Sequence, residues 1–181
     1  MYKRQVEHPA VKNPAQELED MGCEVIKISP DENGEINARD IFAAVNEDTF
    51  LVSCMLVNNE NGYILPVEKA FSMIKKKYPQ VLTHCDCVQG FMKIPVKAKK
   101  LNADMISLSG HKIYAPKGIG ALYVKKGIHI PPFMLGGGQE KGFRSGTESV
   151  PLICGFGAAV KKLAPNVSAN FEKAADIQAY L

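Results

Sequence analysis

Residues 49–57 read TFLVSCMLV, a nearly continuous apolar run. Such a run is typical of a strand inside a parallel sheet, because helices cover both faces of that strand. Three later segments are similarly strand-like: VLTHCD (81–86), DMISLS (104–109) and GALYV (120–124). CEVIKI (23–28) is rich in β-branched residues and is bounded by Gly22 and Pro30, so we expect a strand there as well.

Segments with helical character separate these strands. Asn13-Pro14 is typical of a helix start, with Asn as the cap and Pro at the first helical position. Asn37 and Pro66 are expected to begin two further helices. The remaining predicted helices cover 96–101, 150–163 and 171–181. Helices that alternate with strands over short connections predict an α/β fold, a mostly parallel sheet with helices on both faces.

The composition excludes several classes of protein. The net charge of the 181-residue chain is only +3, which does not favour binding to nucleic acid or to an anionic membrane. No apolar run reaches the roughly 18 residues of a membrane-spanning helix, and the N-terminus lacks the apolar centre of a secretory signal. The five cysteines (23, 54, 85, 87 and 154) lack the spacing of a disulfide framework. We therefore expect free thiols and a cytoplasmic protein.

Polar side chains follow the predicted strands where each strand ends. Asn58 and Asn59 follow the 49–57 strand, Asp86 ends the next one with Gln89 behind it, and Ser109-Gly110-His111-Lys112 ends the third. In an open parallel sheet, ligands bind outside the carboxyl ends of the strands. A Lys amine can form a Schiff base with an aldehyde, a carboxylate can hold a pyridinium proton, and Ser and His can bind a phosphate. These residue types suit an aldehyde cofactor with a phosphate and a basic ring nitrogen.

Two other segments have compositions that bear on function. His84-Cys85-Asp86-Cys87 contains metal-ligand types, but no second ligand pair at zinc-site spacing accompanies it, so no metal is expected. Residues 127–147 lack regular periodicity and contain GGG at 136–138. A long loop of this kind in a compact domain is more often functional than idle.

The segment LSGHKIYAPKGIGALYV (108–124) strongly resembles the cofactor-lysine segment of the cysteine desulfurases. These are pyridoxal 5'-phosphate enzymes of the class V aminotransferase group. VNNENG (57–62), HCDCVQG (84–90) and GGGQEKGFRSGTESV (136–150) resemble the same family, and the RSGT element is similar to its NifS/IscS-type branch. The resemblance runs from about Glu7 to Val160 with four motifs in family order, and this order makes chance similarity a poor explanation.

The resemblance implies a role for each matched residue. Lys112 would form the Schiff base and move a proton at the substrate Cα, and His8 would stack on the ring face and take part in proton transfer. The other implied contacts are Asp86 to the pyridine nitrogen, Gln89 to the phenolic oxygen, Asn59 to substrate or cofactor, and Ser109 and His111 to the phosphate. Thr147 would reach the phosphate in a partner subunit, which implies a homodimer with shared sites.

The resemblance also implies a fold type I large domain, here only in part. We expect residues 1–165 to form the cofactor-binding core and 166–181 a helical tail. Nothing in residues 1–6 supplies the family's first phosphate loop, and none of the five cysteines matches the family nucleophile.

The implied reaction converts L-cysteine to L-alanine. The sulfur passes to an enzyme cysteine as a persulfide and on to an acceptor protein, for iron–sulfur cluster assembly, RNA thiolation or cofactor synthesis. We expect this chain alone to be inactive. Two alternatives stay open: a related class V enzyme (a selenocysteine lyase or an aminotransferase), or a non-catalytic piece.

Overall fold

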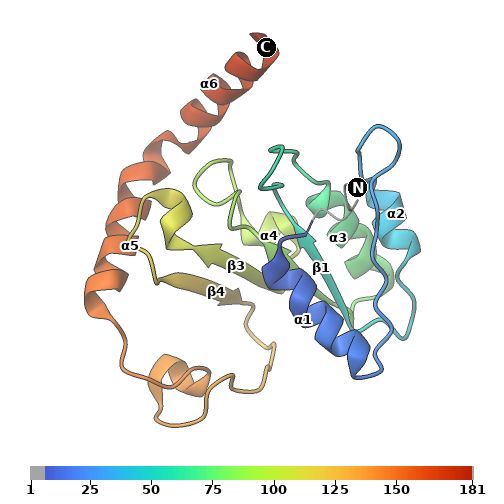
Figure 1. Cartoon of the computed structure of the whole chain (residues 1–181), viewed down its shortest axis with the longest axis horizontal. Helices are drawn as coiled ribbons and strands as arrows, with labels where there is room; N and C mark the ends of the chain where they lie inside the picture. The colour runs from blue at the N-terminus through green and yellow to red at the C-terminus, as the bar shows by residue number, and fades with distance from the viewer. Residues whose placement is uncertain (1–6, 181) are drawn as a thin grey trace.

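The computed structural model describes residues 7–180 and contains one four-stranded sheet in the order β1-β2-β3-β4. The strands are β1 (Leu51–Met55), β2 (Leu82–Asp86), β3 (Met105–Ser109) and β4 (Gly120–Val124). The first three are parallel, and β4 runs antiparallel to β3 (Figure 1). The four strands predicted from residue 49 onward are therefore confirmed, as is a mostly parallel sheet.

The described residues also form six α-helices and three short 3₁₀ turns. The helices are α1 (Pro9–Asp20), α2 (Ala38–Ala43), α3 (Val67–Lys77), α4 (Ala98–Leu101), α5 (Val150–Leu163) and α6 (Val167–Tyr180). The turns are η1 (Gly110–Ile113), η2 (Gln139–Gly142) and η3 (Ala164–Asn166). None of these helices is long and apolar enough to cross a membrane. The 150–163 helix agrees with its predicted bounds, and the helix predicted from residue 66 begins at Val67.

The hydrophobic core lies between one face of the sheet and helices α2, α3 and α4. Phe71 and Ile74 of α3 are fully buried, and they share this core with Cys54, Cys85 and Ile106 of the strands. Register pairs Cys54 with Cys85 and Cys85 with Ile106, so the three side chains lie on the same face. In Figure 1, α1 lies nearer to the viewer than the sheet and α3 lies behind it.

The strand predicted over 23–28 is wrong. The segment is irregular, although Val25 and Ile28 are half-buried. A strand needs a partner backbone, and no hydrogen-bond ladder joins this segment to β1 or to any other described strand. Side chains of the segment and of β1 instead line a cleft of about 530 Å³ between them. The composition of the segment favours a strand, but composition does not show whether a partner strand lies beside it.

The helix start predicted at Asn13-Pro14 is also wrong. Helix α1 begins at Pro9, and Pro14 lies inside it. His8 is the capping residue, since its Nδ1 accepts a hydrogen bond from the Ala10 N–H at 3.1 Å. Two prolines in this segment are each compatible with a first helical turn. The cap at His8 decides between them, because its ring satisfies an N–H that the helix itself leaves without a partner.

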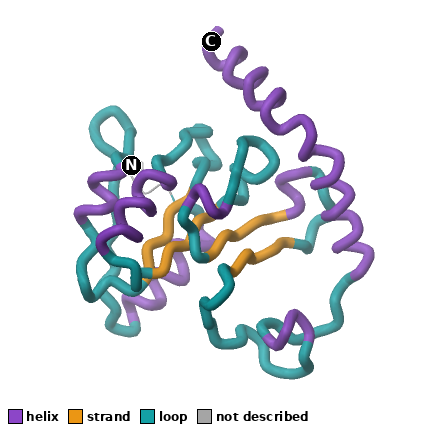
Figure 2. The backbone as a smooth tube through the Cα atoms, turned by 180° about the vertical axis from the view of Figure 1, so that it is seen from behind, coloured by secondary structure: helices purple, strands orange, loops and turns teal. Residues whose placement is uncertain are grey.

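The C-terminal third of the chain is less buried than the rest. The 127–147 stretch is irregular, as predicted, apart from η2 and an isolated bridge between Met134 and Arg144. Helix α5 packs against η1, and α6 then extends away from the sheet (Figures 1 and 2). Neither helix contains a buried residue. The predicted division into a core of residues 1–165 and a tail of residues 166–181 would fall inside η3, and it stays a prediction. Residues 1–6 and 181 of these two units lie outside the described part of the chain.

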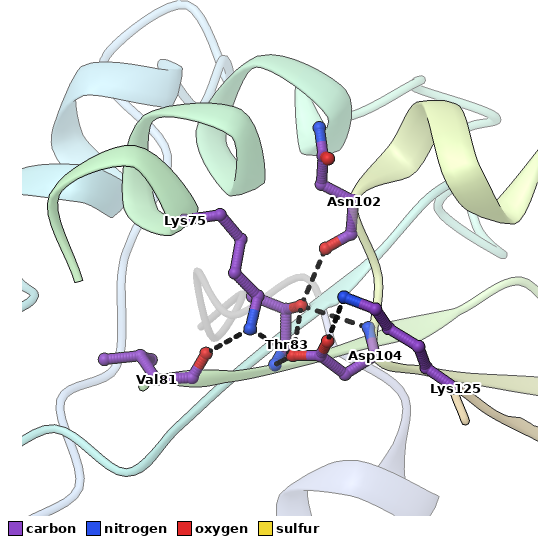
Figure 3. Close-up of polar contacts among 6 residues, drawn as sticks. All are labelled: Lys75, Val81, Thr83, Asn102, Asp104 and Lys125. Carbon is purple, nitrogen blue, oxygen red and sulfur yellow. Dashed lines mark hydrogen bonds and ion pairs between the residues drawn. The ribbon is translucent and has the colours of Figure 1, made fainter. Parts of the chain in front are cut away.

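A buried ion-pair network joins α3 to three strands at the amino-terminal edge of the parallel sheet (Figure 3). Asp104 is 1% exposed and its carboxylate pairs with Lys75 of α3 and, at 3.4 Å, with Lys125 just after β4. The same carboxylate accepts the Thr83 N–H at 3.1 Å, and the Asp104 N–H donates to the Thr83 carbonyl at 2.9 Å. Burial alone would raise the pKa of Asp104, but the hydrogen bonds from Lys75, Thr83 and Lys125 hold it below its usual value.

Removing this charge is expected to destabilise the fold. Asp104→Asn leaves Lys75 without its counter-ion in a largely buried place, so we expect a loss of about 3 kcal/mol in the free energy of unfolding. The matched control is Glu68→Gln, which breaks the exposed pair with Lys100 at 3.2 Å and is expected to change stability by less than about 1 kcal/mol. Urea unfolding followed by circular dichroism measures both variants.

The same pair makes stability depend on acid. Because the pKa of Asp104 is lowered in the folded state, its contribution is complete above the unfolded value of about 3.9 and disappears as the pH falls through the folded value. The wild type is therefore expected to lose more stability between about pH 5 and about pH 2 than Asp104→Asn does. Equal acid sensitivity of the two proteins would contradict this role.

Candidate functional site

The carboxyl ends of the three parallel strands lie at one edge of the sheet, opposite the Asp104 network. Register pairs Met55 with Asp86, and Asp86 with Ser107, so the last residues of β1 and β2 are neighbours. Ser109 ends β3 and leads directly into η1, which carries Lys112. The structure therefore places the predicted Asp86, Ser109, His111 and Lys112 on adjacent elements of this edge.

Asp86 is a buried carboxylate, 7% exposed, at the end of β2. Its Oδ1 accepts the Val88 N–H at 2.9 Å. No ion pair is formed with it by any described residue, in contrast with Asp104. A buried carboxylate is unfavourable without a cationic or hydrogen-bonding partner, so this position favours a ligand that brings a donor or a positive charge.

A row of side-chain hydrogen bonds crosses the sheet beside Asp86. His84 lies on the same face of β2 as Asp86, two residues earlier, and its ring joins Ser53 of β1 to Ser107 of β3, with both nitrogen–oxygen distances 2.8 Å. Burial lowers the pKa of His84, although the Asp86 charge acts in the opposite direction. A neutral imidazole is compatible with both hydrogen bonds, because one ring nitrogen then donates to a serine hydroxyl and the other accepts from one. His84 was not among the predicted site residues, although its position two residues before Asp86 places both side chains on the same face of the strand.

Two lysines lie near each other beside the site. Lys93 donates to the Gln89 Oε1 at 2.6 Å. Burial lowers the pKa of Lys93, and the positive charge of Lys112 lowers it further. Because Lys93 occupies the carbonyl oxygen of Gln89, the amide NH₂ of Gln89 is left as the donor for another group. Lys93 was not predicted, and nothing in its sequence context distinguishes it from a solvated lysine.

Ser109 and His111 form a second polar pair. The Ser109 Oγ lies 2.8 Å from the His111 Nδ1, and the pair is open to solvent. This arrangement is compatible with binding an oxyanion, since a hydroxyl and an imidazole can both donate.

The two asparagines after β1 differ in their surroundings. Asn58 is buried, and its Oδ1 accepts the N–H groups of Glu60 and Asn61 at 2.8 and 3.1 Å, so it shapes the turn. Asn59 is exposed beside it. The predicted ligand contact of Asn59 stays a prediction.

The segment before α1 approaches the same edge. Glu7 accepts the Met55 N–H on Oε1 at 2.6 Å, which brings Glu7 to the last residue of β1. His8 follows directly and is exposed, with its Nδ1 used in capping α1. Unlike His8, Glu7 was not predicted as a site residue, because a single glutamate before a histidine forms no sequence pattern of its own.

Thr147 is not brought to this edge within one chain. It is exposed and lies between η2 and α5. Figures 1 and 2 both show this stretch on the side of the molecule away from α1 and β1. A role of Thr147 in a partner's site stays a prediction.

The sequence profile of the class V aminotransferases matches residues 3–181, and the chain belongs to that family. Among curated relatives, it is 43% identical over 157 residues to a cysteine desulfurase of Nostoc sp. (strain PCC 7120 / SAG 25.82 / UTEX 2576), covering 87% of this chain and 39% of that protein. A mitosomal cysteine desulfurase of Trachipleistophora hominis is also 43% identical over 157 residues, covering 86% of this chain and 35% of that protein. The chain thus spans less than half the length of these relatives.

Solved structures give the same family and establish the fold. A "NIFS-LIKE PROTEIN" superposes with a TM-score of 0.86 at 42% identity, over 91% of this chain and 45% of that chain. A structure described as "SspA in complex with cysteine" gives a TM-score of 0.83 at 39% identity, over 94% and 50%. The predicted resemblance is confirmed, and so is a partial fold type I large domain.

The position of Lys112 depends on a close backbone approach at Gly110. A Cβ at Gly110 would lie 2.8 Å from the Ile119 Cγ2 and 3.1 Å from the Ile119 carbonyl oxygen. Gly110→Ala is therefore expected to lower the free energy of unfolding by about 1–3 kcal/mol through overpacking. The control Gly157→Ala, in helix α5 with open space around its Cβ position, should instead stabilise the chain by up to about 1 kcal/mol. Thermal unfolding compares the two, and a Gly110→Ala variant as stable as wild type would contradict the prediction.

Proposed function

We propose that this chain carries the pyridoxal 5'-phosphate site of a cysteine desulfurase, which converts L-cysteine to L-alanine and passes the sulfur to an enzyme cysteine. The observation that carries the proposal is the buried Asp86, which has no cationic partner among residues 7–180 and lies one loop away from Gln89 and Lys93. The relatives named as cysteine desulfurases and the related structure described with bound cysteine support the choice of substrate.

The residues present fit the proposed cofactor. A pyridinium nitrogen would supply the cationic partner that Asp86 lacks among residues 7–180, and the Gln89 amide would donate to the phenolic oxygen. Ser109 and His111 would bind the phosphate, and Lys112 would bind the aldehyde carbon. When bound, the cofactor acts as an electron sink for the bonds around the substrate Cα.

Lys112 and His8 are proposed as the proton-transferring groups. Lys112 Nζ would take and return the proton at the substrate Cα. The ammonium groups of Lys93 and Lys112 lie close enough for their charges to interact. His8 keeps its Nε2 for a proton, because its Nδ1 caps α1.

None of the five cysteines is assigned the sulfur-accepting role. Cys54, Cys85 and Cys87 are buried. The hydrogen bond with Cys87 and burial raise the pKa of Cys85, and burial raises the pKa of Cys54. A sulfur acceptor must react as a thiolate, which these surroundings disfavour. Cys23 and Cys154 lie outside the site edge, in the 23–28 segment and in α5.

The compartment and the acceptor belong to the proposal as well. We place the protein in the cytoplasm with a sulfur-acceptor protein as partner. The relatives include bacterial, mitosomal and mitochondrial proteins, so family membership does not fix the compartment.

The test of the site is covalent trapping. Protein mixed with pyridoxal 5'-phosphate is expected to turn yellow, and borohydride should then fix the cofactor to the peptide that contains Lys112. Lys112→Ala should abolish both signals, whereas the control Lys117→Ala, an exposed lysine nearby, should retain them. Peptide mapping that places most of the label on Lys117 or Lys125 would overturn the assignment.

We further propose a homodimer, supported by exposed apolar side chains on the stretch that leads to Thr147. Phe133 is 89% exposed and Leu135 is 87% exposed. Tyr123 of β4 and Val150 and Ile153 of α5 are exposed as well. Large apolar patches on a soluble domain commonly mark contact surfaces. A second copy is the partner that would also use Thr147.

Light scattering measures this assembly. We expect a dimer for the wild type and a monomer for the double variant Phe133→Asp and Leu135→Asp, because two charges in an apolar contact are unfavourable. Met21→Asp is the control, since Met21 is an exposed apolar residue at the end of α1, away from this stretch. A wild-type monomer at high concentration would contradict the proposal.

A further inference from the structure

Glu7 is a half-buried titratable group with no part in the chemistry proposed above. Its Oε1 accepts the Met55 N–H at 2.6 Å, and its Oε2 is buried with no hydrogen-bond partner among the described residues. Met55 is the last residue of β1 and is paired in register with Asp86. Glu7 therefore links the turn before α1 to the edge of the sheet that holds the site.

The charges around Glu7 favour its neutral form. Burial raises the pKa of Glu7 to about 7, and the Asp86 carboxylate of β2 acts in the same direction. The Met55 N–H and the Lys12 ammonium of α1 act against them. The Cys54 thiol of β1 also lies near Glu7 and is held neutral, and Glu7 forms no ion pair among the described residues.

We propose that Glu7 is a positioning residue: in its protonated form it holds the turn that carries His8 against the end of β1 beside Asp86, and on ionisation it releases that turn. That His8 then faces the cofactor rests on the proposed function, whereas the link between Glu7 and β1 does not. A neutral carboxyl group can accept from Met55 and keep its second oxygen buried. A carboxylate there would leave a charged oxygen buried without a donor and would add a second negative charge near Asp86.

The direction of the pH effect follows from the raised pKa. Between the ordinary value of 4.5 and about 7, the folded chain keeps a proton on Glu7 that the unfolded chain has lost. The contribution of Glu7 to stability is therefore complete below pH 4.5 and is lost as the pH rises through about 7.

The first experiment observes Glu7 directly. Carboxyl ¹³C chemical shifts of glutamate-labelled protein, without cofactor, are titrated for wild type, Glu7→Gln and Glu17→Gln. We expect one resonance with a midpoint near neutral pH that is absent only from Glu7→Gln. Glu17→Gln is the matched control, since Glu17 is an exposed glutamate on α1. A wild type whose glutamates all titrate at their ordinary pKa overturns the proposal.

The second experiment observes the link to β1. Glu7→Gln keeps an acceptor for Met55 and mimics the neutral acid, so its Met55 amide should stay protected from hydrogen exchange at every pH. In the wild type, the protection factor should fall by about tenfold or more between pH 6 and pH 8, because the cost of burying the carboxylate outweighs its hydrogen bond with Met55 and favours release of the turn. Glu7→Ala should lose the protection at both pH values. Protection that is independent of pH in wild type, or retained in Glu7→Ala, overturns the proposal.

The third experiment separates this proposal from the proposed function. If the cofactor binds, the pH at which the visible absorption of the bound chromophore changes should differ between wild type and Glu7→Gln, while Glu17→Gln follows wild type. An identical transition in wild type and Glu7→Gln would show that Glu7 does not position groups at the cofactor. If no chromophore forms on Lys112 in any variant, the proposed function fails, and the titration and exchange results still decide the role of Glu7.

Discussion

The ion pairs of Asp104 fix the geometry on which the remaining structure depends. Asp104 directly precedes β3. Its carboxylate contacts Lys75 of α3, the Thr83 N–H near the start of β2, and Lys125 just after β4. Its backbone pairs with Thr83 through the Asp104 N–H and with Lys125 through the Asp104 carbonyl oxygen. One buried group therefore constrains how β2, β3 and β4 are positioned along the strand direction at this edge. The carboxyl ends of β2 and β3 are aligned as a consequence.

Asp104 and Asp86 are two buried carboxylates at opposite edges of the same sheet, and they differ in the charged groups around them. Asp104 has two lysines and the Thr83 N–H, whereas Asp86 has the Val88 N–H and no cation among the described residues. Each aspartate adjoins an apolar strand, so the sequence alone gives them the same local appearance. Only the fold shows that lysines neutralise Asp104, whereas Asp86 has no cation among residues 7–180.

Much of the architecture was predictable from local pattern. Strands from residue 49 onward were predicted correctly because each is an apolar run bounded by turn residues. Asp86 and Lys112 were predicted as site residues because they lie at or just after the ends of such strands. The 23–28 strand failed because strand formation needs a neighbour that composition cannot provide. Glu7 and His84 were missed for a related reason, because each contacts residues distant in sequence: Met55 for Glu7, and the serines of β1 and β3 for His84.

The alternation of β2 shows why register matters to the site. Thr83 and Cys85 point toward the covered side of the sheet and are fully buried, while His84 and Asp86 lie on the other face. A slip of one residue would place thiols at the site edge and would force the imidazole and the carboxylate into the apolar core. The two faces are therefore chemically incompatible, and this incompatibility selects one register. The bonds between Thr83 and Asp104 hold that register at the far end of the strand, so the polar face that carries Asp86 depends on a network that contributes no atom to it.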